Sequence, residues 1–274
     1  MKKDNLGDRM KKYEKCSQFN LMDKVPVVIR LDGAHFHTFT KGLNTPFDIE
    51  FQDVMRKTMK DLVDNIQNCI LGYTQSDEIT LVLLDTKTLE TQSWFNNNLQ
   101  KIVSISASLA TMFFNKHINE LTEERFSNKK LIGYFDSRAF NIPLEDLPNV
   151  LIWRSQDAYR NAVSMFALSR FSHKELQYKS TKDKIEMLGE DYVESQFNCL
   201  PYEMYYLKNE YGQFRYSSKK RNYEDLYQYF SDCLKEPLQN QNNLQGHSQD
   251  LTMNGYISKI DQNSFLKSYD NYIG

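Results

Sequence analysis

Several features that would fix a protein class are scarce in this sequence of 274 residues. Its four cysteines, Cys16, Cys69, Cys199 and Cys233, include no C-x-x-C pair, so neither a zinc site nor a disulfide framework is indicated. Apolar runs such as residues 25–31 are far too short to cross a membrane. The charged N-terminal segment has no apolar run behind it, so we expect no signal peptide and a cytoplasmic protein.

An excess of one charge is also missing. The 34 basic and 36 acidic residues leave a net charge of −2, which excludes a polybasic carrier. A nucleic-acid partner would therefore need a local basic patch. Hydrophobic residues make up 40% of the chain and charged residues 26%, which excludes collagen-like, mucin-like and fully disordered proteins. The chain is long enough to bury a substantial core in one large domain or two small ones.

Apolar periodicity predicts an ordered series of helices and strands over the first half of the chain. The predicted elements are a helix at 4–18, a strand at 25–31, a helix from Pro46, a hairpin at 69–85, a helix at 91–117 and a strand at 130–140. The last five form a β-α-β-β-α-β order, which is the split βαβ arrangement of ferredoxin-like folds. We therefore predict an α+β fold with a core at about 20–142, in which the third strand lies beside the first.

The second half of the chain reads as helical and then polar. Helices are predicted at 151–172 and 181–198, and a hairpin at 203–216. We expect one catalytic domain over 1–216, with a basic helical region at about 150–200. From about 217 to 274 the sequence becomes Asn/Gln-rich, which predicts a polar tail or extension.

Three acidic residues fall at the ends of predicted strands. Asp32 ends the first strand, and Asp77 and Glu78 lie at the turn of the hairpin, which the topology brings to the same sheet edge. Since neighbouring strand residues point to opposite faces, one of Asp77 and Glu78 should face Asp32. Carboxylates this close repel unless a cation lies between them, and Mg²⁺ suits carboxylate and phosphate oxygens. Two such ions clamp the attacking and leaving oxygens of a phosphoryl transfer. The alternative is a set of ordinary solvated turn acids.

Residues 151–185 are basic in an otherwise slightly acidic chain, with seven Lys or Arg against three Asp or Glu. Such a run is either a solvated helix face or a track for RNA phosphates. The contrast with the rest of the chain favours the RNA track.

Four short motifs resemble one known family. They are Arg30-Leu31-Asp32-Gly33-x-x-Phe36-His37-x-Phe39, Tyr73-x-Gln75-Ser76-Asp77-Glu78, Phe135-Asp136-x-Arg138 and Trp153-Arg154-x-x-Asp157. Together they are similar to the tRNA-His guanylyltransferase family of 3′-to-5′ polymerases. The segments 157–161 and 171–180 resemble its Thg1-like branch, which implies repair of 5′-truncated tRNA more than strict G−1 addition to tRNA-His.

The resemblance implies a polymerase-type palm and a catalytic role for Asp32, Asp77 and Glu78. Asp32, Asp77 and the carbonyl of Gly33 would hold two Mg²⁺ ions. ATP or GTP would activate a 5′-monophosphate, and the 3′-hydroxyl of an incoming NTP would attack the activated 5′ end. Relatives of this kind assemble as homotetramers, so the resemblance implies one here.

Further residues are candidates for contacts to phosphate or RNA. Ser76 has a hydroxyl beside the acids, and a strand arginine at Arg138 offers a fork of donors. The resemblance adds His37 and Lys101 as nucleotide or triphosphate contacts. The RNA candidates are Arg154, Arg160, Asn161, His173, Lys174 and Lys179.

Two other functions remain open from the sequence. A palm-fold nucleotide cyclase would share the metal chemistry and need no RNA. A catalytically decayed tRNA-binding module is supported by three departures from the family pattern, at Ala34, Thr45 and Thr74.

Overall fold

The structure, a computed structural model, describes residues 5–86, 88–121, 132–199, 203–208 and 213–234. The predicted turn at Asn209–Gly212 and the end of the predicted tail, 235–274, lie outside the described residues. Among the helices of the described part, none is long and apolar enough to cross a membrane.

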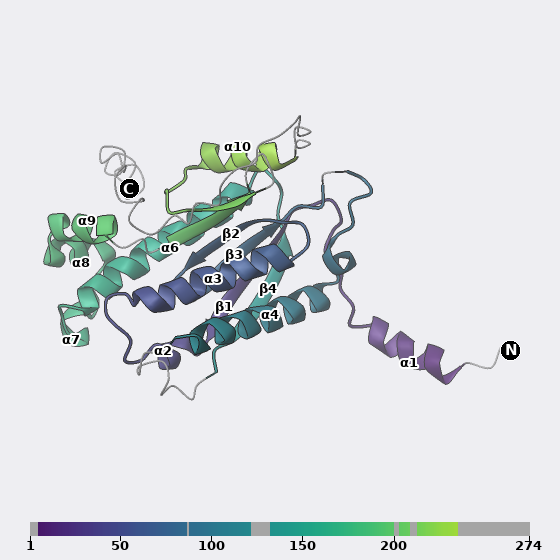
Figure 1. The fold of residues 1–274 in the computed structure, drawn as a ribbon, viewed down its shortest axis with the longest axis horizontal. Coiled ribbons are helices and arrows are strands. Elements are labelled where there is room, and N and C mark those ends of the chain that lie inside the picture. The colour runs from purple at the N-terminus through teal and green to yellow at the C-terminus, as the bar shows by residue number, and fades with distance from the viewer. Residues whose placement is uncertain (1–4, 87, 122–131, 200–202, 209–212, 235–274) are drawn as a thin grey trace.

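One six-stranded antiparallel sheet organises the fold, in the order β4-β1-β3-β2-β5-β6 (Figure 1). The third strand lies beside the first, as predicted, and the hairpin β5–β6 extends the sheet beyond the split βαβ core. The predicted α+β fold is confirmed. The strands are β1 (Val27–Ala34), β2 (Cys69–Gln75), β3 (Glu78–Leu83), β4 (Tyr134–Asn141), β5 (Glu203–Lys208) and β6 (Phe214–Ser217).

Helices cover both faces of this sheet. Alternate residues of β1 separate the two cores: Ile29 and Leu31 pack under α3 and α4, whereas Val28 faces α6 and α10. Burial on both faces explains why β1 reads as a continuous apolar run. The helices are α1 (Leu6–Lys15), α2 (Phe36–Phe39), α3 (Ile49–Asn65), α4 (Leu99–Asn119), α6 (Leu147–Leu168), α7 (His173–Leu176), α8 (Thr181–Leu188), α9 (Glu190–Cys199) and α10 (Tyr223–Leu234).

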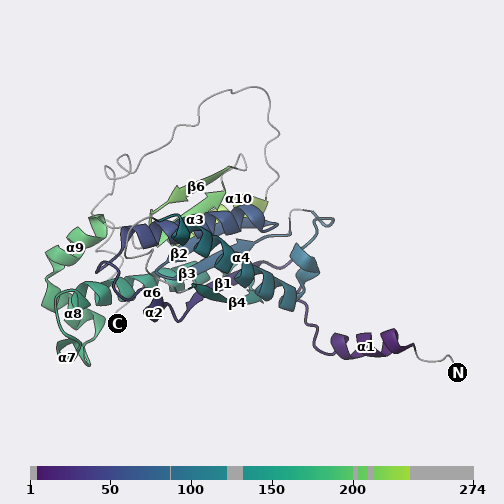
Figure 2. The same ribbon diagram turned by 60° about the horizontal axis from the view of Figure 1, so that its bottom comes forward.

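The two ends of the molecule differ in their packing. Both views place α7, α8 and α9 together at one end of α6, and α1 apart from the sheet at the other end (Figures 1 and 2). None of the residues of α1 is buried. By contrast, α10 packs Leu226 and Phe230 into the second core, although it lies in the segment predicted to be a polar tail or extension.

Two predicted helices begin late or are interrupted in the structure. The helix predicted at 91–117 begins only at Leu99, because Phe95 and Asn96 have φ of 51° and Asn98 caps the helix through Lys101 N. A 3₁₀ turn, η1 (Trp94–Asn97), precedes it. The helix predicted at 181–198 is divided into α8 and α9 at Gly189, whose φ of 84° no right-handed helix accommodates.

Candidate active site

The three predicted acids meet at one edge of the sheet, formed by the end of β1 and the neighbouring β2–β3 turn. Asp32 of β1 pairs directly with Glu78 of β3. Directly opposed residues of antiparallel strands have Cα atoms about 4.5 to 5.5 Å apart and side chains on the same face. Asp77 lies in the adjoining turn, where its carbonyl oxygen accepts a 3.1 Å hydrogen bond from the backbone N–H of Gly33. This backbone hydrogen bond joins the end of β1 to the β2–β3 turn.

The tight β2–β3 turn positions Asp77. Gln75 pairs with Glu78, so the loop contains only Ser76 and Asp77. Ser76 takes a left-handed φ of 48°, and its hydroxyl donates a 3.0 Å hydrogen bond to Asp77 Oδ1. Beneath the turn, the Thr74 hydroxyl donates to the Glu78 carbonyl oxygen at 2.9 Å. Thr74, a departure from the family pattern, therefore helps to hold the hairpin closed.

Burial and mutual repulsion perturb the acids. Burial raises the pKa of Asp77, and the nearby Asp32 carboxylate raises it further, against the Ser76 hydrogen bond. Burial also raises the pKa of Glu78, opposed by the guanidinium groups of Arg154 and Arg30. A shared cation would relieve the repulsion between Asp32 and Asp77 by neutralising both carboxylates.

A buried ion pair orients Glu78. Arg154 of α6 donates from Nε to Glu78 Oε1 at 2.6 Å and from Nη2 to Oε2 at 2.8 Å. Both side chains are 7% exposed, so this bidentate bond is shielded from solvent. Arg30 Nε lies 3.9 Å from the same carboxylate and has no hydrogen-bond partner among the described residues.

Gly33 is required by the close approach of Phe36. A Cβ placed on Gly33 would lie 2.4 Å from the Phe36 ring, a separation that real Cβ atoms essentially never show. The ring in turn packs against Phe39, Phe114 and Phe135. This aromatic cluster holds α2 over the end of β1 and keeps the Gly33 backbone beside Asp32.

The donor set fits a hard divalent cation better than zinc. The described residues contain no group of three His, Cys, Asp or Glu side chains arranged for a metal ion. Asp32, Asp77 and the Gly33 carbonyl would instead supply two carboxylates and a backbone oxygen. Mg²⁺ typically takes one or two carboxylates and completes its shell with water and phosphate oxygens. Burial is the main cause of the raised pKa of Asp77 and the nearby Asp32 carboxylate adds to it, so a cation bound to both carboxylates would favour their charged forms.

The nucleotide-binding candidates divide between the two edges of the sheet. His37 is exposed on α2, at the edge that carries the acids, and Ser76 lies in the turn itself. Arg138 shares the face of Asp32, one pleat away, because it pairs with Arg30.

Lys101 is the exception. It lies in the first turn of α4, whose cap residue Asn98 bridges to Asn20 ahead of β1. Phe114, which contacts Phe36 near the acids, is about 20 Å farther along the helix at 1.5 Å per residue. The structure therefore does not bring Lys101 to the acids within one copy of the chain.

Arg154 was predicted to bind RNA, but its guanidinium is buried against Glu78 and Asp157. Asp157 also forms an ion pair with Arg160, which is half exposed. Basic and acidic side chains therefore alternate along α6, from the buried Arg154 to the exposed Arg160. Asn161 is exposed on the following turn. The Arg154 guanidinium is thus paired with two carboxylates, whereas Arg160 and Asn161 are exposed on the outer surface of α6.

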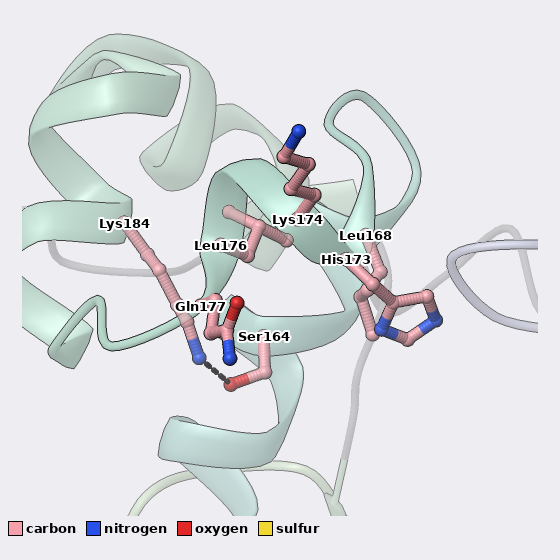
Figure 3. A pocket seen from close by; sticks show the side chains of 7 residues that line it. All are labelled: Ser164, Leu168, His173, Lys174, Leu176, Gln177 and Lys184. Carbon is pink, nitrogen blue, oxygen red and sulfur yellow. Dashed lines mark hydrogen bonds between the residues drawn. The ribbon is translucent and has the colours of Figure 1, made fainter.

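A pocket of about 540 Å³ lies beyond this surface, between α6, α7 and α8 (Figure 3). Ser164 and Leu168 of α6 continue the helix face of Asp157 and Asn161, and Lys184 donates a 3.0 Å hydrogen bond to the Ser164 hydroxyl. His173 and Lys174, both predicted RNA contacts, line the pocket. Lys179 is exposed on the connection between α7 and α8.

One buried carboxyl beside the site was not recognised from the sequence. Glu203 of β5 accepts hydrogen bonds from the Tyr73 hydroxyl at 2.6 Å and the Ser155 hydroxyl at 3.2 Å. Burial raises its pKa. Ser155 adjoins Arg154, so this network ties α6 to the sheet beside the Arg154–Glu78 pair. A glutamate at the start of a strand has no sequence pattern that would predict this link between α6 and the sheet.

These features define the class of the protein: a palm-like α+β fold with acids gathered at strand ends, an arrangement suited to transfer of nucleotidyl groups. A family model described as tRNAHis guanylyltransferase (Thg1) matches residues 7–143. The uncharacterised protein R259 of Acanthamoeba polyphaga mimivirus is 31% identical over 205 residues, 68% of this chain and 70% of that protein.

Solved structures agree with the family model. A bacterial tRNA(His) guanylyltransferase (Thg1)-like protein in complex with ATP is 38% identical, with a TM-score of 0.74 over 82% of this chain and 99% of that chain. A structure of such a bacterial protein in complex with GTP is 36% identical, with a TM-score of 0.68 over 83% of this chain and 99% of that chain. The chain belongs to the tRNAHis guanylyltransferase family and is a nucleotidyltransferase.

Proposed function

We propose that this chain adds nucleotides in the 3′-to-5′ direction to the 5′ end of tRNA, with repair of 5′-truncated tRNA as its main activity. The convergence of Asp32, Asp77 and Glu78 at one sheet edge carries the proposal. ATP and GTP, which the related bacterial structures hold, would serve as substrates here.

The proposed reaction takes place at the RNA 5′ phosphate. A 5′-monophosphate is first joined to AMP from ATP, with release of pyrophosphate. The 3′-hydroxyl of an incoming NTP then attacks that phosphate, forms the new phosphodiester bond and releases AMP. A 5′-triphosphorylated end needs no activation and releases pyrophosphate instead.

The chain's own residues would orient these groups. Asp32, Asp77 and the Gly33 carbonyl would hold Mg²⁺, which would stabilise the charge that builds on the transferred phosphate. Glu78, held by Arg154, would keep a fixed negative charge beside them. Ser76, His37 and Arg138 surround this edge, and their donors would bind the phosphates of the incoming nucleotide.

The outer surface of α6 would guide the RNA toward the acids. Arg160, Asn161 and the pocket residues His173 and Lys174 follow one another along α6 and α7. The Ser164 end of the pocket lies about 15 Å from Arg154 along the helix, at 1.5 Å per residue. A 5′ end at Asp32 would thus leave the adjoining strand over this cationic surface.

The test incubates the protein with 5′-truncated tRNA, labelled NTP and Mg²⁺, using monophosphate and triphosphate ends separately. We expect 5′ extension from both, with the monophosphate end requiring ATP. The matched control is Asp77→Asn, which preserves size and removes the charge. Absence of extension from either end would reject the proposal.

The same assay separates the other two candidates. A nucleotide cyclase would convert NTP without any RNA. A decayed module would bind tRNA without turnover, and its binding would not change in Asp77→Ala. We also propose a homotetramer, which sedimentation of the purified chain measures directly.

A further inference from the structure

Trp153 is an exposed aromatic residue at the active site that the proposed chemistry leaves without a role. It lies on α6 with 48% of its surface exposed, although Arg154 and Ser155 beside it are buried. The other tryptophan, Trp94, is 8% exposed. Exposure alone assigns no ligand, since other aromatic residues such as Phe19 are more open to water, and it is the position of Trp153 that distinguishes it.

Two guanidinium groups fix the position of this ring. The Arg154 Cζ lies 4.5 Å from the ring centroid and the Arg30 Cζ lies 5.7 Å from it. Both guanidinium groups also approach Glu78, Arg154 through its bidentate bond and Arg30 at 3.9 Å. Trp153 is therefore tied to the carboxylate that pairs across the sheet with Asp32.

The surroundings of Trp153 are charged, which argues against a protein partner. Arg138 and Asp136 of β4 pair with Arg30 and Asp32 on the sheet face that carries Arg30, Arg160 lies about two turns farther along α6, and all three are exposed. Docking surfaces for proteins are contiguous apolar patches, whereas here a single ring stands among cations and carboxylates. A flat aromatic surface beside guanidinium groups is instead the combination that binds a nucleotide, by stacking on its base and attracting its phosphate.

We infer that Trp153 stacks on a nucleobase next to the reacting phosphate. The inference rests on the proposed function for the kind of ligand. Two sources share this chemistry: the terminal base of the RNA 5′ end and the base of the free NTP. In either case stacking would hold the nucleotide against the edge where Asp32, Asp77 and Glu78 meet.

The experiment offers each ligand alone, so that no extension takes place and the result does not depend on the proposed reaction. ATP, GTP and a 5′-triphosphorylated truncated tRNA are titrated separately against the full chain. Dissociation constants and tryptophan fluorescence are recorded for the unmodified chain, Trp153→Ala, Trp153→Phe and Trp94→Phe. Phe19→Ala, an exposed aromatic ahead of β1 at the opposite edge of the sheet, is the matched control.

We expect Trp153→Ala to weaken one class of ligand by about 5- to 100-fold, the range that loss of one stacked base produces. Weakening of ATP or GTP alone assigns the base to the free nucleotide, and weakening of the tRNA alone assigns it to the RNA. Trp153→Phe should lose less affinity, since a smaller ring still stacks. Ligand quenching should persist in Trp94→Phe and vanish in Trp153→Phe, and Phe19→Ala should bind normally.

The inference is overturned if Trp153→Ala binds all three ligands with unchanged dissociation constants, whether or not the fluorescence responds. If circular dichroism shows Trp153→Ala to be misfolded, the two phenylalanine variants decide. Quenching that survives in Trp153→Phe, or that is lost in Trp94→Phe, then also overturns it.

Discussion

Arg154 and Glu78 form a two-pronged ion pair, with N–O separations of 2.6 and 2.8 Å between residues 76 positions apart in the chain. The pair connects α6 to the central strand β3. Because both partners are buried, each depends on the other for compensation of its charge.

Loss of Arg154 should therefore be costly. We expect Arg154→Gln to lower the free energy of unfolding by about 3 to 5 kcal/mol, since it leaves the Glu78 carboxylate buried with only the more distant Arg30 to compensate its charge. Arg154→Lys keeps the charge without the fork and should lose less. Urea unfolding measures both. In Arg160→Gln, which breaks the half-exposed bond to Asp157, the change should stay below about 1 kcal/mol. Equal small effects at the two positions would contradict the buried clamp.

Asp77→Asn should separate metal binding from stability. We expect 5′ extension and Mn²⁺ affinity to fall on the order of 100-fold or more, because a direct ligand matters at least as much as an outer one. The free energy of unfolding should not fall, since the change removes a charge that burial and Asp32 already disfavour. The control is Asp53→Asn, a half-exposed carboxylate paired with Lys57 on α3. Normal Mn²⁺ binding by Asp77→Asn would refute the assigned ligand set.

Glu203 should make the fold more stable as the pH falls. Burial raises its pKa in the folded chain above the ordinary 4.5, so the folded state takes up a proton that the unfolded state has already lost. Its contribution to stability is present below pH 4.5 and is lost as the pH rises through the folded pKa. Unfolding measured between pH 4.5 and 7 should show a weaker pH dependence in Glu203→Gln than in the unmodified chain.

Glu175 supplies a comparison of opposite sign. Hydrogen bonds from the Ser172 hydroxyl and backbone N–H lower its pKa, so it stabilises the fold above the ordinary pKa and ceases to as the pH falls. Glu175→Gln should therefore lose stability at neutral pH and little at acidic pH. If both substitutions changed the pH dependence of stability in the same direction, the environment of Glu203 or of Glu175 would be misassigned.

Gly33→Ala should damage both folding and the site. Its new methyl group would lie 2.4 Å from the Phe36 ring, and relief of this overlap requires α2 to move. We expect a loss of about 1 to 3 kcal/mol by thermal or urea unfolding, as for other overpacked positions. In Gly7→Ala on α1, where the nearest atom is 3.8 Å away, stability should be unchanged or slightly increased. A Gly33→Ala protein as stable as the parent would mean that α2 shifts freely.

Lys174→Ala should weaken RNA binding through electrostatics. Removal of one phosphate contact should lower the slope of log K against log salt by about 0.7 to 0.9 for tRNA. Lys116→Ala on α4 is the control, because it removes an exposed lysine outside the α6–α8 pocket. Binding measured over a range of salt concentrations distinguishes the two variants, and an unchanged slope in Lys174→Ala would exclude the pocket from the RNA track.

The features predictable from the sequence are those set by neighbouring residues. Compact apolar runs predicted β1 and the β2–β3 hairpin, and antiparallel pairing then required Asp32 to lie near Glu78. Helix starts were harder to predict. Trp94 and Phe95 continue the apolar stripe of the following helix in the sequence, yet Phe95 and Asn96 have left-handed φ angles before the Asn98 cap.

The partners of charged residues could not be read from the sequence. Arg154 lies in a basic segment, and only the packing of α6 on β3 reveals that its charge is neutralised by Glu78. The same holds for Glu203, whose partners Tyr73 and Ser155 come from two distant elements. The helix α10 carried a local signal, the spacing of Leu226 and Phe230, which the polar composition around it obscured.

The central place of β1 has a mechanical consequence. Because β1 is hydrogen-bonded to β3 on one side and to β4 on the other, the backbone that carries Asp32 is held in place. An enzyme that lengthens RNA from such a fixed platform cannot follow the growing end. Under the proposed function, the acceptor stem would have to slip outward by one nucleotide after each addition, so the contacts to the RNA would have to release and re-form at each cycle.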